Sequence, residues 1–222
     1  MCGRFVAAYD ADKLAHDWDA RVSSSLPPVS WNVAPNVPVR VLVPDKRGAL
    51  WLTAAFWSLI PEWMRDGVPA FPTFNARIET ALERPAFRDV ARNHRLIVPM
   101  TAYYEWDKHK RPYCFTARNR GVLWAAGLFS IRPADRARRL SCAILTRDAV
   151  GAAARVHDRM PVLLDHATAM RWMRPTTNPA ELLAEAAEDG ARTAGTLDSW
   201  QVAPLRGDGP GLMKPMEQAT LF

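Results

Sequence analysis

Cysteine is scarce in this chain, and its number and spacing argue against a disulfide-stabilised protein and against a zinc protein. The 222 residues include three cysteines, Cys2, Cys114 and Cys142, an odd number with no CxxC pair. A disulfide framework is therefore not expected, in agreement with a reducing compartment. The five histidines are scattered and form no HExxH or similar pattern. We therefore expect no metal site and no cofactor.

Long apolar runs are also missing. No stretch approaches the roughly 18 uninterrupted apolar residues that a membrane-spanning helix needs. Charged residues such as Arg4, Asp10 and Lys13 interrupt the start of the chain, so it has no signal-peptide core. The composition, 49% hydrophobic with nine tryptophans, is typical of a packed globular protein. We expect a soluble, cytoplasmic protein that has no membrane contact and is a monomer.

Positive charge is concentrated in the middle of the chain. From Arg77 to Arg159 there are 17 Lys and Arg against 8 Asp and Glu, whereas the remainder has 12 against 15. The net charge of the chain, +6 with neutral histidines, therefore comes from this central region. A concentrated basic face suits a polyanion such as nucleic acid.

Strand patterns outnumber helix patterns. Strands rich in apolar and β-branched residues are predicted over 38–43, 50–57, 95–100, 112–117, 122–129, 140–146 and 160–164. Helices are predicted over 10–18, 165–173 and 178–187, and another from a capping box at Thr80 and Glu83 with Pro85 in its first turn. The helices do not alternate regularly with the strands. We therefore predict an α+β fold, a single β-rich domain with a curved, barrel-like mixed sheet and flanking helices.

A composition break falls near residue 204. The stretch that follows, from Arg206 onward, is rich in glycine and proline. We therefore predict one domain over residues 1–204 and a flexible tail over residues 205–222.

Cys2 has a chemical capacity that an internal cysteine lacks. Removal of Met1 would give Cys2 a free α-amine and a thiol on adjacent carbons. Together these two groups convert an aldehyde into a five-membered thiazolidine ring. Holding both groups on one residue gives the ring-closing step a high effective concentration.

Six short segments, each weak evidence alone, are specific in combination. In this order and spacing the chain resembles the SRAP family, the SOS-response-associated peptidase domains, over roughly residues 2–204. The segments are Met1-Cys-Gly-Arg-Phe5, Trp31-Asn-Val-Ala-Pro35, Trp57-Ser-Leu-Ile-Pro61, Phe74-Asn-Ala-Arg-Ile-Glu-Thr80, Tyr104-Glu-Trp106 and His157-Asp-Arg-Met-Pro161.

The resemblance implies a DNA-damage protein that senses abasic sites in single-stranded DNA. Members of the family link their N-terminal cysteine to the aldehyde of the damaged sugar. Reversal of that crosslink and an AP-lyase activity are further activities left open. Four functional positions of the family match Cys2, Asn75, Glu105 and His157, and the implied partner predicts a nucleoid-associated protein.

Elementary chemistry supports three of these positions independently. An α-amine with a pKa near 8 is partly neutral at physiological pH and can attack an aldehyde. Glu105 lies in a strand-like segment beside Trp106, where burial would raise its pKa and suit it to proton transfer. Free histidine has a reference pKa near neutrality, and a residue of this type at position 157 suits proton transfer to or from the sugar oxygen. Asn75 offers both donors and an acceptor, but its assignment depends on the resemblance.

Arginines and tryptophans are the predicted DNA contacts. Arginine can give two donors to phosphate oxygens, and exposed aromatic rings stack on unpaired bases. The candidates are Arg4, Arg77, Arg88 and Arg159 for phosphates, and Trp63 and Trp106 for bases.

The last residues suggest a protein partner. Gln218, Leu221 and Phe222 match the QxxLF peptides that bacterial replication proteins insert into the sliding clamp. The alternative interpretation is a chain end with no partner.

Two other functions remain open on the sequence. In one, Cys2 is the nucleophile of an N-terminal-nucleophile peptidase or hydrolase, with its own amine as the base. In the other, the chain is a non-catalytic module that binds single-stranded DNA and Cys2 is structural. The basic centre of the chain favours a DNA-directed function over the peptidase.

Overall fold

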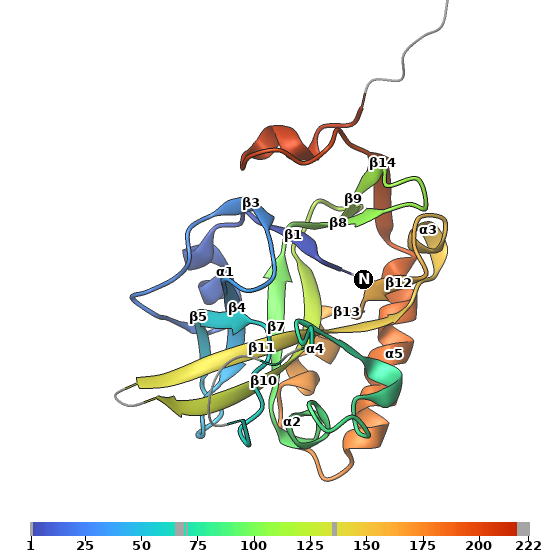
Figure 1. Ribbon diagram of the computed structural model, residues 1–222. Helices are drawn as coiled ribbons and strands as arrows, with labels where there is room; N and C mark the ends of the chain where they lie inside the picture. The colour runs from blue at the N-terminus through green and yellow to red at the C-terminus, as the bar shows by residue number, and fades with distance from the viewer. Residues whose placement is uncertain (1, 65–68, 70, 135–136, 217–222) are drawn as a thin grey trace, which may run out of the picture.

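The computed structural model describes residues 2–64, 69, 71–134 and 137–216. Its centre is a closed barrel of five strands (Figure 1): β4 (Pro38–Pro44), β5 (Leu50–Trp57), β7 (Arg95–Met100), β10 (Leu123–Ala134) and β11 (Ala137–Asp148). Neighbouring strands pair antiparallel in the order β11-β10-β7-β4-β5. A parallel pairing of Ser141 with Phe56 and of Cys142 with Trp57 closes the barrel.

A second sheet lies beside one end of the barrel. Its order is β14 (Leu197–Gln201), β9 (Pro112–Ala117), β8 (Ala102–Trp106), β1 (Arg4–Ala7) and β3 (Ser30–Val33), antiparallel throughout. Only Thr101 separates β7 of the barrel from β8 of this sheet. Because strand side chains alternate, Tyr103 joins the main core while Ala102 and Tyr104 join a smaller cluster on the other face.

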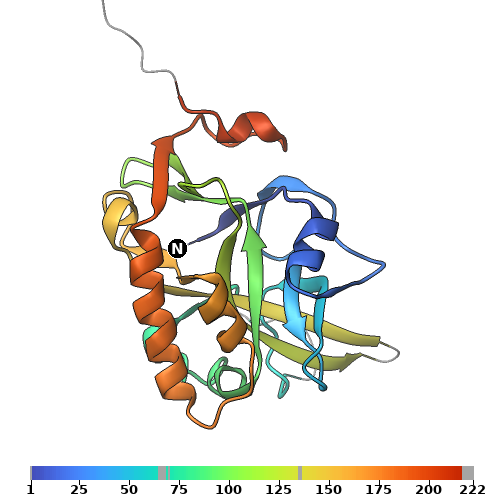
Figure 2. The same ribbon diagram turned by 180° about the vertical axis from the view of Figure 1, so that it is seen from behind.

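Four short strands and five helices complete the described structure. The strands are β2 (Arg21–Val22), β6 (Asn75–Arg77), β12 (Arg159–Pro161) and β13 (Leu163–Leu164). The helices are α1 (Ala11–Asp17), α2 (Arg88–Asn93), α3 (Gly151–Ala154), α4 (His166–Trp172) and α5 (Pro179–Ala194), with 3-10 turns at Ile78–Thr80 and Pro210–Met213. Figure 2 shows α5 running along the side of the molecule nearest the N-terminus.

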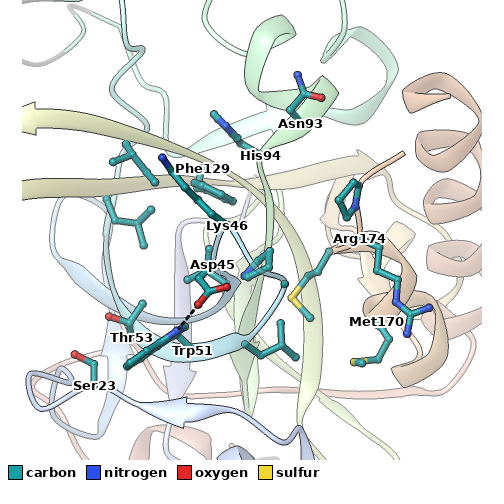
Figure 3. Close-up of a pocket in the computed structure, with 18 residues that line it drawn as sticks. Ser23, Asp45, Lys46, Trp51, Thr53, Asn93, His94, Phe129, Met170 and Arg174 are labelled. Carbon is teal, nitrogen blue, oxygen red and sulfur yellow. Dashed lines mark hydrogen bonds between the residues drawn. The ribbon is translucent and has the colours of Figure 1, made fainter. Parts of the chain in front are cut away.

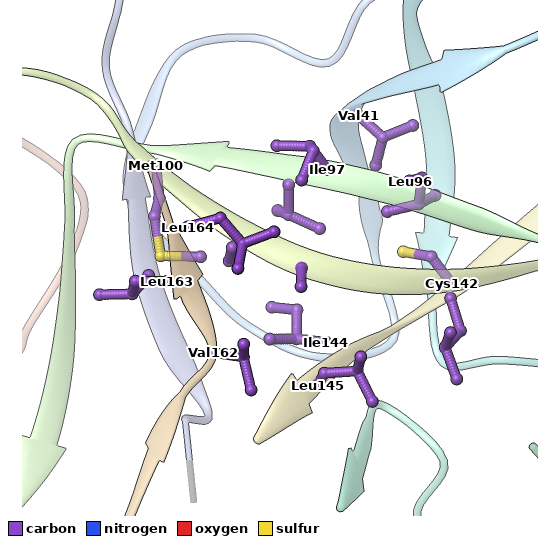
Figure 4. Close-up of a cluster of buried hydrophobic side chains, with 14 of the residues drawn as sticks. Val41, Leu96, Ile97, Met100, Cys142, Ile144, Leu145, Val162, Leu163 and Leu164 are labelled. Atoms are coloured by element: carbon purple, nitrogen blue, oxygen red, sulfur yellow. The ribbon is translucent and has the colours of Figure 1, made fainter. Parts of the chain in front are cut away.

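The interior of the barrel is filled by aliphatic side chains (Figure 4). Val41, Ile97 and Ile144 come from three different barrel strands and are fully buried. Leu163 and Leu164 of β13 extend this core toward α5. Burial of this kind contributes about 1.5–3 kcal/mol per large aliphatic side chain, so the barrel is a rigid support for the loops at its ends.

The predicted α+β fold with a barrel-like sheet is confirmed. The strands predicted over residues 50–57, 95–100 and 112–117 have the predicted bounds. The strand predicted over 160–164 is instead two short strands, β12, which pairs with β11, and β13, which pairs with β10. The helix predicted from the capping box at Thr80 is wrong in its start. Residues 81–87 form turns, in which Glu83 and Arg84 both donate to the Thr80 carbonyl, and the helix begins at Arg88. The last helix is longer than predicted and ends at Ala194.

Residues 205–216 have structure where the composition predicts a flexible tail. The backbone of Trp31 donates to Asp208, and the indole of Trp200 donates to the Met213 carbonyl at 2.8 Å. Leu212 packs against the smaller apolar cluster. The glycines and prolines of this segment therefore shape a packed turn and a 3-10 helix rather than an unpaired end.

Candidate active site

Cys2 lies beside the strand that carries Glu105. Strand β1 pairs with β8 so that Arg4 faces Tyr104, which brings the residues before Arg4 to the level of Glu105. Cys2 is fully buried. Burial raises the pKa of its thiol well above the ordinary value, and the nearby Glu105 carboxylate raises it further. The sulfur is therefore a neutral thiol at physiological pH.

Asn75 contacts Cys2 from a short strand that pairs with the barrel. Strand β6 pairs in parallel with β11, with Asn75 opposite Ile144. The side-chain Nδ2 of Asn75 donates to the backbone carbonyl of Cys2 at 2.9 Å. Among the described residues its Oδ1 is buried without a hydrogen-bond partner. The Asn75 side chain thus orients Cys2 and keeps an acceptor beside it.

Glu105 and His157 form the polar pair of the site. His157 follows α3, and its Nε2 lies 3.5 Å from Oε1 of Glu105. Burial raises the pKa of Glu105, and His157 opposes that shift. The backbone N–H of Arg159 donates to Nδ1 of His157 at 2.9 Å, so the neutral ring carries its proton on Nε2, toward Glu105. Nδ1 also lies 2.7 Å from Asp158 Oδ1, which accepts a hydrogen bond from the ring whenever Nδ1 itself carries a proton.

Tyr103 also lies in this region, although it is not among the site residues predicted from the sequence. It shares a face of β8 with Glu105, and its ring stacks on Phe115 with centroids 4.7 Å apart. Its hydroxyl is buried without a hydrogen-bond partner in the described part of the chain. Burial raises its pKa well above the ordinary value, and Cys2 and Glu105 raise it further. The i, i+2 spacing from Glu105 in a strand is the signal that could have identified it.

Arg159, predicted to contact phosphate, is the centre of an ion-pair cluster. Its guanidinium donates to Glu79 at 2.9 and 3.0 Å and to Asp148 at 2.5 Å. It also donates to the carbonyl of Thr146 at 2.8 Å. The side chain is only 8% exposed. A phosphate would have to compete with two carboxylates for these donors, so DNA contact by Arg159 stays a prediction.

The other predicted DNA contacts lie on several elements. Arg4 donates to Asn32 at 2.9 Å, and Arg77 is exposed on β6, two residues after Asn75. Arg88 is exposed at the start of α2, with its Nε 3.6 Å from Asp89. Trp63 is 58% exposed in the turn after Pro61, whereas Trp106 packs partly buried against the smaller core cluster. Of these candidates, Arg4 and Arg77 are thus the two on β1 and β6, the strands next to Cys2 and Asn75.

Two predictions fall on the ends of the chain. The residues predicted to bind the clamp, Gln218, Leu221 and Phe222, lie outside the described residues, as does Met1.

Within the part of the chain that the structure describes, no cluster of three or more His, Cys, Asp or Glu residues could hold a metal ion. In the same residues, no helix is long and apolar enough to cross a membrane.

Comparison with known proteins identifies the family. The model of the SOS response associated peptidase (SRAP) family matches residues 1–205, and the chain belongs to that family. The Bacillus subtilis abasic site processing protein YoaM is 31% identical over 190 residues, covering 82% of this chain and 83% of YoaM. The Escherichia coli abasic site processing protein YedK is 28% identical, covering 97% of this chain and 100% of YedK.

Solved structures share the fold. A Bacteroides thetaiotaomicron protein matches with a TM-score of 0.81 at 20% identity, covering 97% of this chain and 100% of its own. A Bordetella bronchiseptica protein matches with a TM-score of 0.75 at 22% identity, covering 91% and 100% of the two chains. At this identity the likeness shows the barrel architecture alone.

Proposed function

We propose that this protein processes abasic sites in single-stranded DNA by linking Cys2, freed of Met1, to the aldehyde of the damaged sugar. The observation that carries the proposal is the convergence of four residues from distant segments. Asn75 holds the Cys2 carbonyl at 2.9 Å, Glu105 is close enough to raise the thiol pKa, and His157 lies 3.5 Å from Glu105. Relatives named as abasic site processing proteins supply the substrate.

The high pKa of the Cys2 thiol sets the order of the covalent steps. The α-amine attacks the aldehyde carbon first, because an amine with a pKa near 8 is partly neutral whereas the buried thiol stays protonated. The resulting carbinolamine loses water and becomes an imine. The sulfur then adds to the imine carbon while the thiol proton passes to nitrogen, which closes the thiazolidine ring. One aldehyde and one aminothiol thus give one ring and one water.

Glu105 and His157 are suited to move the protons in these steps. The carbinolamine hydroxyl must gain a proton to leave as water. A carboxyl with a raised pKa holds a proton to higher pH than an ordinary glutamate and can donate it there. When both of its ring nitrogens are protonated, His157 can replace the lost proton through Nε2, which lies 3.5 Å from Glu105. The same pair can protonate the ring for the reverse reaction, so crosslink reversal belongs to the proposal.

Binding of a single strand is supported by charge and by exposed side chains. Arg77 is exposed near Asn75, and Trp63 offers an aromatic face to an unpaired base. The basic central region adds attraction for phosphates that weakens as salt is added. A protein with this substrate would work at the nucleoid, and docking of Gln218, Leu221 and Phe222 on the sliding clamp is a separate prediction.

The test is a crosslinking assay with a single-stranded oligonucleotide that carries one abasic site. Wild-type protein should give a band stable in a denaturing gel, and Cys2→Ala should give none. Cys2→Ser keeps the amine but closes the ring poorly, so it should shift the outcome from stable linkage toward strand cleavage. The intact mass of the purified chain checks that Met1 has been removed.

Two outcomes would overturn the proposal. A shift in native gels alone, unchanged in Cys2→Ala, would make the protein a non-catalytic DNA-binding module. Release of peptide fragments without reaction at the abasic site would make it an N-terminal-nucleophile hydrolase.

A further inference from the structure

A cavity of about 660 Å³ opens at the end of the barrel where β4 turns into β5. Its walls come from that turn, from β10 and β11, and from the ends of α2 and α4 (Figure 3). Most of the lining is apolar, with Trp51, Phe129 and Met173 among the largest side chains. The volume is typical of sites that bind ligands.

Contacts within the wall hold these side chains in place. The His94 ring stacks on Phe129 with centroids 4.9 Å apart. The Trp51 indole donates to Asp45 at 3.4 Å (Figure 3), and the guanidinium of Arg21 lies over its ring at 5.6 Å. The aromatic surfaces are therefore ordered before any ligand arrives, which lowers the entropy cost of binding.

The mouth of this cavity is basic. A smaller hollow of about 310 Å³ adjoins it, shares Asp45 and Lys46, and adds Arg21 and Arg47. Arg174 also lines the cavity. Asp45 is the one acid among the described lining residues. It accepts from the backbone N–H groups of Arg47 and Ala49, and these bonds lower its pKa.

These basic side chains are available to a ligand. Lys46 and Arg47 are exposed, and within the described residues neither Lys46 nor Arg174 forms an ion pair. The two adjoining hollows thus share an apolar surface, and three cationic residues, Arg21, Lys46 and Arg47, border the smaller one. An extended ligand could occupy both.

We propose that these two hollows bind an acidic peptide, with its apolar side chains in the cavity and its carboxylates against Lys46, Arg47 and Arg21. A peptide fits better than a compact molecule because the two hollows lie side by side along one surface. Charge complementarity selects an acidic sequence over a neutral or basic one. This is an interaction surface for a protein partner.

The surface is separate from the proposed active site. Leu140 of β11 lines the cavity, whereas Ile144 of the same strand pairs with Asn75. Four residues of extended chain span about 13 Å. The cavity and the Cys2 site therefore lie at different points along β11, and the proposal does not depend on the proposed function.

Fluorescence anisotropy with a labelled hexapeptide tests the proposal. The probe contains two phenylalanines and four aspartates. Two matched probes replace either the aspartates by asparagine or the phenylalanines by alanine. We expect saturable binding of the first probe, weakened by added salt, and markedly weaker binding of both others. Hydrogen exchange on the wild-type complex should show protection at residues 43–53 and 170–175.

Variants locate the binding site. Lys46→Glu should weaken binding by about fivefold or more, whereas Lys108→Glu, the same charge change in an exposed turn of the other sheet, should leave it unchanged. Both variants should still crosslink abasic DNA. Equal weakening by the two variants, equal binding of the asparagine probe, or protection elsewhere in the chain would overturn the proposal. Direct binding of a fluorescent fatty acid, with no binding of the peptide, would overturn the proposal and assign the cavity to a small anion.

Discussion

The chemistry of the site depends on what surrounds single residues. Glu105 is an ordinary glutamate in the sequence, yet only 4% of its surface is exposed, and burial raises its pKa. The folded state therefore prefers the protonated carboxyl. A carboxyl that keeps its proton is useful as a proton donor, but the folded protein loses stability whenever this carboxyl is ionised. Removing the carboxyl of Glu105 should therefore lower the activity and raise the stability.

Replacing Glu105 by glutamine should separate the two effects. Glutamine keeps the shape but transfers no proton, so the crosslinking rate should fall by about 10²-fold. Because the folded-state pKa is raised, wild-type protein loses stability as pH rises through that value, and Glu105→Gln does not. In urea unfolding, the free energy of unfolding of the variant should exceed that of wild type at pH 8. This difference should be smaller at pH 5. Glu188→Gln, on an exposed face of α5, is the control and should change neither quantity.

Tyr103 allows a stability test at the same scale. Its hydroxyl is buried without a partner in the described residues, whereas its ring packs on Phe115. Tyr103→Phe should raise the free energy of unfolding by about 1 kcal/mol, since it removes an unsatisfied polar group and keeps the stack. Urea unfolding measures this, with Tyr113→Phe as the partly exposed control. A loss of stability would mean that the hydroxyl has a partner in solution.

At the scale of elements, β11 organises the site. The short strands β6 and β12 both pair with its last residues, β6 in parallel and β12 antiparallel. This pairing brings the Asn75 segment next to the His157 segment. Arg159 then ties the two together, because its guanidinium binds Glu79 just after β6 and Asp148 at the end of β11.

Arg159→Lys should loosen this arrangement. Lysine keeps the charge but cannot form the forked hydrogen bonds to Glu79 and Asp148 together. We expect the free energy of unfolding to fall by about 1–3 kcal/mol, measured by urea unfolding, since a buried network loses donors while its acceptors remain. Arg155→Lys, in an exposed part of the chain, is the matched control. Unchanged stability with weaker DNA binding would instead support the phosphate contact predicted from the sequence.

At the scale of the whole molecule, the segment after β14 packs against the smaller apolar cluster of the second sheet. Residues 205–216 cover Trp31 and Trp200 through Leu212, Met213 and the hydrogen bond from the Trp200 indole. The isolated bridge between Val202 and Pro215 holds the segment at its far end. The segment therefore belongs to the folded unit in the described structure.

Truncation measures this contribution. A chain ending at Arg206 should unfold with about 2 kcal/mol less free energy than a chain ending at Met216, because apolar surface on Trp31 and Trp200 becomes exposed. For a chain of this size the melting temperature should fall by roughly 4–8 °C. Equal melting temperatures for the two truncated chains would contradict the packing.

The sequence alone predicted the five barrel strands and the candidate chemistry, but not strands β1, β3 and β14 of the second sheet. Strand patterns such as residues 95–100 are local, so propensity and alternation suffice to place them. Cys2, Asn75, Glu105 and His157 were selected as candidates because each lies in a short motif. Only the tertiary structure decided that Cys2 is buried, that Arg159 faces carboxylates, that residues 205–216 pack, and that a basic cavity opens beside Trp51. Each of these depends on contacts between residues far apart in the chain, such as Trp31 with Asp208, and local sequence carries no record of them.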